Sequence, residues 1–273
     1  MTSILLVLSL FLILSYGAFT WHYLANWRGT ARWPRNPRVE HSLLGVLLLV
    51  QALVVVAPLS VSGGLSLGVG HALGVMVWIM LLIYWTCSFF YRVEGLQLFM
   101  MPLAMAALAF AIAFPGRHMV SDLSNPAFVL HILVSMLAYS LFAIGALIAV
   151  LMLLLERSLH HKRMSLLARQ LPPLLTLEKM MFQVIAVGFL LLTVALVTGV
   201  VFSEEVFGKA AALTHKTVFS VISWLLFAAL LLGRRLQGWR GRVAIRWTLA
   251  GFLSLMLAYV GSKVVLELIL QRG

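Results

Sequence analysis

Eight long apolar runs, separated by short polar links, constrain this 273-residue chain more than any other feature. A helix needs about 20 apolar residues to cross the hydrocarbon core of a bilayer. Only helices and closed barrels can satisfy every backbone polar group inside lipid. We therefore predict an all-α, polytopic membrane helix bundle of about eight transmembrane helices, which forms a single integral membrane domain over residues 1–273. The runs cover roughly residues 3–24, 41–60, 68–90, 97–115, 127–155, 180–202, 217–233 and 246–268.

The composition agrees with a membrane protein and disfavours a nucleic-acid-binding one. Hydrophobic residues make up 63% of the chain and charged residues only 10%, whereas soluble domains carry about 25% charged residues. The net charge is +12, but the basic residues lie in the short links between apolar runs. We therefore expect the lipid bilayer, and no nucleic acid, as a partner. The first run has no basic stretch before it and no clear cleavage site, so we expect a retained helix.

The basic residues also predict an orientation. Fifteen of the 20 Lys and Arg residues lie in the first, third, fifth and seventh links. Because cytoplasmic loops carry an excess of basic residues, these links are predicted to be cytoplasmic and both termini outside.

The sequence offers no catalytic machinery. Cys87 is the single cysteine, so neither a CxxC redox site nor a CxxCH haem attachment site exists. There is no Walker A or HExxH motif, and no Asp/Glu pair within an apolar run. We therefore predict that the protein is not an enzyme.

Three of the eight histidines are candidate ligands at the outer face. His131 opens the fifth apolar run and His215 lies just before the seventh, so both are expected at one depth. Neutral imidazole ligates haem iron and zinc, so this pair could hold a haem between two helices. His71, at the start of the third run, is the third candidate. In the alternative interpretation, each is an interfacial polar residue at a helix end.

The second half of the chain resembles a known family. The pieces that carry the resemblance are "LHILVSMLAYSLF", "LLTVALVTG", "GWRGR" and "AYVGS". They are similar to the cytochrome c assembly protein family, which contains haem-handling membrane proteins of the CcsA, CcmC and HemX type. The branch most like this chain is the bacterial inner-membrane YpjD-like or HemX-like one. The resemblance covers about residues 125–270, and residues 1–120 match by helix count and hydropathy alone.

The resemblance implies a haem-binding or haem-handling protein of cytochrome c assembly in the bacterial inner (plasma) membrane. It implies haem b as a non-covalent cofactor, with His131 and His215 as ligands of the haem iron and His71 as a further contact. Other cytochrome c maturation proteins, or another membrane protein, would be the partners. The family's tryptophan-rich loop would fall within residues 201–219, which contain no tryptophan. This departure keeps an alternative open, a cofactor-free membrane scaffold or regulatory protein that retains the fold. A transporter is disfavoured by the few buried charges and the lack of an evident inverted repeat.

Overall fold

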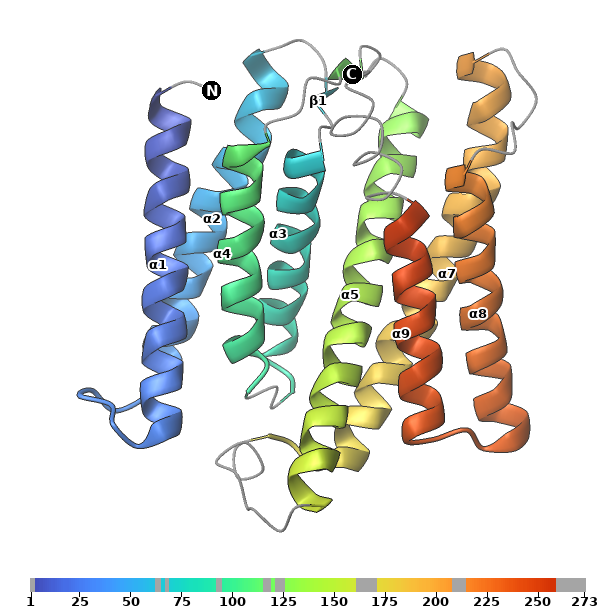
Figure 1. Ribbon diagram of the computed structural model, residues 1–273. Helices are drawn as coiled ribbons and strands as arrows, with labels where there is room; N and C mark the ends of the chain where they lie inside the picture. The colour runs from blue at the N-terminus through green and yellow to red at the C-terminus, as the bar shows by residue number, and fades with distance from the viewer. Residues whose placement is uncertain are drawn as a thin grey trace. The chain divides into compact units, whose positions relative to one another are not determined.

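The computed structural model describes eight helices and one short strand pair (Figure 1). The described residues are 3–61, 65–66, 69–91, 95–114, 119–120, 126–160, 171–207 and 215–258. The strands β1 (Leu65–Ser66) and β2 (Met119–Val120) pair antiparallel over two residues each. The helices are α1 (Ser3–Arg28), α2 (Pro37–Val61), α3 (Val69–Cys87), α4 (Gln97–Ala113), α5 (Pro126–His160), α7 (Leu174–Phe207), α8 (His215–Gln237) and α9 (Arg242–Met256).

The chain divides into two compact helical units. Unit 1 comprises Met1–Asp122 with Arg157–Pro172, and unit 2 comprises Leu123–Glu156 with Pro173–Gly273. Unit 1 therefore holds α1 to α4 and the strand pair, and unit 2 holds α5 up to Glu156 and α7 to α9. The single membrane domain expected from the sequence stays a prediction, and each unit is described below by itself.

The fold confirms the predicted class, a polytopic helical membrane protein. Six of the described helices are long and apolar enough to cross a membrane, and α4 is a shorter apolar helix. Large apolar side chains such as Leu14, Leu49 and Leu190 are about 70% exposed. In water this exposure would be costly, but in a bilayer these side chains meet acyl chains.

In unit 1, α1 packs against α2 and α4, and α3 packs against the same two helices. The buried side of α1 includes Leu12 and Tyr16, which are fully buried. The Tyr16 hydroxyl donates to Oε1 of Gln51 on α2 at 2.6 Å. This bond satisfies the phenol inside the bundle, where an unpaired polar group would be expensive.

Two tryptophans of α3 form hydrogen bonds with α2. The indole N–H of Trp78 donates to the Leu48 carbonyl at 2.9 Å, and that of Trp85 donates to the His41 carbonyl at 3.0 Å. Trp85 reaches α2 because Gly45 has no side chain, and a Cβ there would lie 3.1 Å from the indole. The start of α2 is thereby fixed against the end of α3.

Unit 2 is held by ring stacking and close helix approach. Phe142 on α5 and Phe227 on α8 are fully buried and stack with their centroids 3.9 Å apart. Gly251 on α9 leaves room for Phe227, since a Cβ there would lie 2.8 Å from the ring. The Ser223 hydroxyl on α8 also donates to the Gly251 carbonyl at 2.7 Å. These contacts hold α5, α8 and α9 together.

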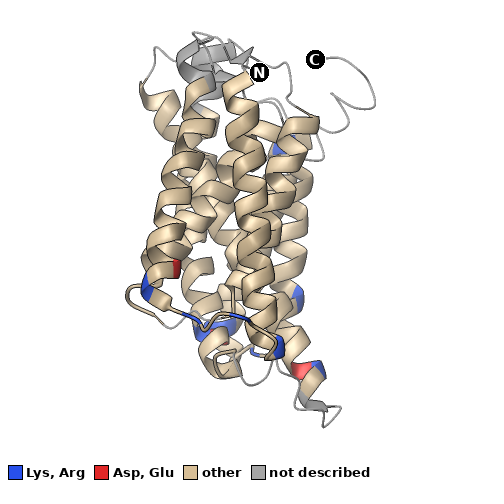
Figure 2. Ribbon diagram, turned by 90° about the vertical axis from the view of Figure 1, so that its left-hand side faces the viewer, with Lys and Arg blue, Asp and Glu red and all other residues tan. Residues whose placement is uncertain are grey.

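Basic residues gather at one end of the helices in each unit (Figure 2). Arg28 ends α1, and Arg234 and Arg235 lie in the last turn of α8. Lys216 lies at the opposite end of unit 2, in the first turn of α8. The predicted orientation, with both termini outside, would put the basic ends in the cytoplasm. The end of the eighth apolar run and the basic link at 161–170 lie outside the described residues.

Candidate functional site

The histidine predicted to open the fifth membrane helix lies against α7. Nδ1 of His131, in the second turn of α5, is 2.7 Å from Oγ1 of Thr198 on α7. The Thr198 hydroxyl itself donates to the Val194 carbonyl one turn earlier, at 2.8 Å. A hydroxyl has one proton to donate and two lone pairs to accept with. Thr198 therefore accepts its bond from an N–H at Nδ1 of His131.

This bond selects the tautomer of His131. With the proton on Nδ1, neutral imidazole carries its unprotonated lone pair on Nε2. Histidines that bind metals commonly donate their other ring N–H to a fixed acceptor, which sets the ring orientation and raises ligand basicity. The arrangement of His131 and Thr198 therefore has the chemistry of a metal ligand and its orienting partner.

The surroundings of His131 suit a flat apolar ligand. Gly199 on α7 lies close to the ring, since a Cβ built there would be in ordinary van der Waals contact with Cε1 of His131, at 3.4 Å. Phe128 lies nearly parallel to the imidazole, with the two ring centroids 6.4 Å apart. Leu130 on α5 and Val200 on α7 are exposed. The donor set and this apolar setting fit a haem held by an imidazole.

The other two predicted ligands begin helices. His215 is the first residue of α8 and is exposed, at the same end of unit 2 as His131. The approach of the two imidazoles across this end stays a prediction. His71 lies in the first turn of α3, in unit 1.

In the described parts of the chain, no group of three or more His, Cys, Asp or Glu side chains could hold a metal ion. Haem iron, however, takes only one or two protein ligands.

At the opposite end of unit 2, one buried carboxylate joins three helices. Glu178 on α7 is 6% exposed and accepts from Arg234 of α8 at 2.6 Å and from Arg240 at 3.2 Å. It also accepts from the backbone N–H of Gly241, the residue before α9, at 3.0 Å. The positive φ of Gly241, 55°, belongs to this tight turn. We call Glu178, Arg234, Arg240 and Gly241 the Glu178 cluster, which ties α7, α8 and the start of α9 together.

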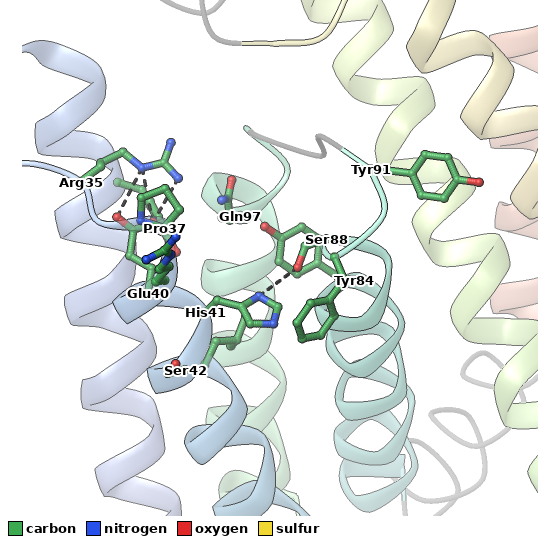
Figure 3. A pocket seen from close by; sticks show the side chains of 13 residues that line it. Arg35, Pro37, Glu40, His41, Ser42, Tyr84, Ser88, Tyr91 and Gln97 are labelled. Carbon is green, nitrogen blue, oxygen red and sulfur yellow. Dashed lines mark hydrogen bonds and ion pairs between the residues drawn. The ribbon is translucent and has the colours of Figure 1, made fainter.

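Unit 1 contains a pocket of about 600 Å³ that the sequence does not predict. It lies between the start of α2, the end of α3 and the start of α4, with Tyr23 of α1 also in its wall (Figure 3). Figure 3 shows Arg35 and Glu40 on one side, Tyr84 and Tyr91 on the other, and His41 between them.

A network around Glu40 forms one wall of this pocket. The carboxylate is 7% exposed. Arg35 donates to it from Nη2 at 3.0 Å, and Nε2 of His22 lies 3.2 Å from it. Two cationic or proton-bearing groups therefore compensate a carboxylate that would be costly to bury alone.

Aromatic rings packed around His41 form a second wall of the pocket. The imidazole of His41 stacks on Trp85 and meets Phe89 edge-on, and its Nδ1 lies 3.0 Å from the Ser88 hydroxyl. Because Ser88 donates its own proton to the Trp85 carbonyl at 2.7 Å, it accepts from Nδ1. His41 is thus held rigidly by its neighbours.

Thr198 and Glu40 are the functional candidates that the sequence did not reveal. Thr198 has one signal, a hydroxyl in an apolar run at the depth expected for His131. Such hydroxyls also bond the preceding turn of their own helix, so the residue type alone does not identify the pairing.

Comparisons with known proteins show which family of membrane proteins the chain is similar to. A family model described as "Cytochrome C assembly protein" matches residues 66–270. The inner membrane protein YpjD of Escherichia coli (strain K12) is 32% identical over 166 residues, which are 61% of this chain and 62% of that protein. The cytochrome c biogenesis protein CcsA of Synechococcus sp. (strain CC9605) is 28% identical over 191 residues, covering 60% of this chain and 63% of that protein.

A third relative, an uncharacterized 28.8 kDa protein of Azospirillum brasilense, is 36% identical over 141 residues, or 52% of each chain. The chain thus spans less than two thirds of the length of these relatives. The apolar helices and the similarity to an inner membrane protein confirm the predicted multi-pass localisation in the inner membrane.

Proposed function

The chain belongs to the cytochrome c assembly protein family, and on that premise we propose that it binds haem for cytochrome c assembly, with His131 as a ligand of the haem iron. The role is one of binding and presentation, without catalysis by the chain's own residues. Haem b, held non-covalently, is the proposed ligand, and other cytochrome c maturation proteins are the proposed partners.

One observation carries this proposal: the 2.7 Å contact between Nδ1 of His131 and the Thr198 hydroxyl. It supports an imidazole whose Nε2 is unprotonated, as ligation of iron requires. When bound, haem would supply an iron centre whose affinity depends on its axial imidazoles and on the apolar surface around it.

Each residue of this site has a distinct role in the proposal. His131 binds the iron, and Thr198 orients the imidazole from α7. Gly199 lets α7 lie close beside the ring, where a Cβ would be 3.4 Å from Cε1 of His131. His215 is proposed as the second ligand because it begins α8 at the same end of unit 2. His71 is proposed as a further contact with the ligand.

The visible absorption spectrum of the detergent-purified protein, with and without added haem b, tests this function. Ligation by histidine should give a Soret band that differs from that of haem in detergent alone. His131→Ala should remove most of the bound haem, and His215→Ala should reduce it.

A second candidate function is a membrane scaffold or regulator without a cofactor. Its support is the absence of tryptophan from residues 201–219, where the family's haem handlers carry a tryptophan-rich loop. Large aromatic faces are what a flat ligand packs against. A scaffold of this kind would show no saturable haem binding, so the same spectra separate the two functions.

A further inference from the structure

The charges around the unit 1 pocket do not cancel. Two arginines, Arg35 and Arg38, and one carboxylate, Glu40, line it. Glu40 is already engaged by Arg35 and by His22. None of the ion pairs found within the described ranges involves Arg38, which is exposed. Among the described residues, the pocket therefore has one positive charge without a carboxylate partner, which favours an anionic ligand.

The surroundings of the pocket place it at the level of lipid headgroups. Arg28, the last residue of α1, and Arg32, between α1 and α2, lie at the same end of unit 1. Trp21 and Trp33 are 70% and 75% exposed there, and Phe89 in the pocket wall is 61% exposed. Exposed aromatic rings near basic residues mark the membrane–water interface. A ligand in this pocket can keep a charged group among the arginines and an apolar part against the rings.

From this combination we propose that the pocket binds the phosphate group of an anionic phospholipid, with Arg38 as its main contact. Basic pockets between membrane helices on the cytoplasmic side suit lipid head groups, and a guanidinium donates two parallel hydrogen bonds to phosphate oxygens. Its volume of about 600 Å³ holds a headgroup. The glycerol and the first acyl carbons lie along Phe89 and Tyr91, both of which are exposed at its edge.

A soluble phosphate ester has the same phosphate chemistry, but the aromatic residues favour the lipid. Such an ester would gain nothing from Phe89 and Tyr91, whereas an acyl chain packs against them. The proposal goes beyond haem binding, because it concerns unit 1 and uses none of the residues proposed to bind haem.

Lipid titration of the full-length protein in a neutral detergent tests the proposal. Phosphatidylglycerol and phosphatidylcholine are added separately to the wild type, to Arg38→Gln and to Arg32→Gln, and bound lipid is counted by native mass spectrometry. Arg32 is the matched control, since it is an exposed arginine of the link just before α2 and lies outside the pocket wall. Arg38→Gln should weaken phosphatidylglycerol binding about tenfold, the effect of one lost charge-assisted hydrogen bond. Arg32→Gln should change it by less than about twofold, as expected for an exposed charge.

A competition experiment distinguishes binding of a lipid from binding of a soluble phosphate ester. Millimolar sn-glycerol 3-phosphate should not displace phosphatidylglycerol, because it lacks the acyl chains. Displacement at such concentrations would overturn the lipid assignment. Equal losses in Arg38→Gln and Arg32→Gln, or equal binding of the two lipids by the wild type, would show that the pocket has no phosphate site. Thermal unfolding of each variant checks that the fold is unchanged.

Discussion

Nδ1 of His131 and Oγ1 of Thr198 lie 2.7 Å apart, although 67 residues separate them in the chain. The contact joins the second turn of α5 to α7, and with the Thr198 hydroxyl as acceptor it leaves Nε2 of the imidazole unprotonated. A histidine that merely faced the headgroups would need no such fixed acceptor. This relationship is the basis for proposing His131 as a haem ligand.

The first prediction concerns Thr198. Thr198→Val keeps the shape of the side chain but removes the hydroxyl, so His131 loses its orienting partner. Affinity for haem b should fall about tenfold, the lower end of the range for residues that orient metal ligands. Thr198→Ser restores the hydroxyl and should recover most of the affinity. In the haem-free protein, ¹⁵N NMR of labelled histidine should show the Nδ1–H tautomer in the wild type and its loss in Thr198→Val. Equal haem affinity in the valine and serine variants would remove Thr198 from the site.

The second prediction concerns the Glu178 cluster. Glu178→Gln leaves Arg234 and Arg240 without their carboxylate and should destabilise unit 2 by about 3 kcal/mol, as for other broken buried pairs. Glu156→Gln is the matched control, because among the described residues Glu156 pairs with Arg242 alone, which is 59% exposed. That loss should be below about 1 kcal/mol. Unfolding in mixed detergent micelles measures both, and equal effects would mean that the cluster has no special role in stability.

The third prediction tests the core of unit 2. Phe227→Ala empties the space between Phe142 and Gly251, and it should cost about 3–5 kcal/mol of unfolding free energy. Leu225 lies two residues away on α8 and is 54% exposed. Leu225→Ala should therefore change stability by no more than about 0.5 kcal/mol. A small loss for Phe227→Ala would contradict the observed packing of α5, α8 and α9.

The fourth prediction tests orientation. The basic ends of both units should be cytoplasmic, because 15 of the 20 Lys and Arg residues lie in the odd-numbered links. A reporter enzyme active only in the periplasm should be silent when fused after Gln237 and active when fused after Gly208. The reverse pattern would place His131 and His215 at the cytoplasmic face and remove the reason for choosing them.

The number and type of helices could be predicted from the sequence, because a bilayer requires apolar runs of a fixed length. The sequence predicted the positions of the helix ends less well. The second helix begins at Pro37 and the sixth apolar run belongs to a helix that begins at Leu174, whereas the runs begin near residues 41 and 180. An apolar run ends at the first charged residue, whereas a helix can continue past a charged residue that is paired. Glu40 is paired with Arg35, and Glu178 is paired with Arg234.

The candidate site could be predicted only in part. The sequence indicated that His131 and His215 lie at one depth, since both open helices on one side. It did not reveal Thr198, because the contact depends on how α5 and α7 are rotated against each other. The unit 1 pocket was equally inaccessible, since it combines side chains from α1 to α4 whose positions depend on packing.

Haem binding by His131 is the central claim, and the absorption spectrum of the full-length protein titrated with haem b tests it most directly. The wild type should bind haem saturably with a histidine-ligated Soret band. His131→Ala should lose most of that binding, while His160→Ala, at the other end of α5, should titrate like the wild type. A His131→Ala variant that binds haem with the wild-type affinity and spectrum, or a wild type that binds none, would contradict the account.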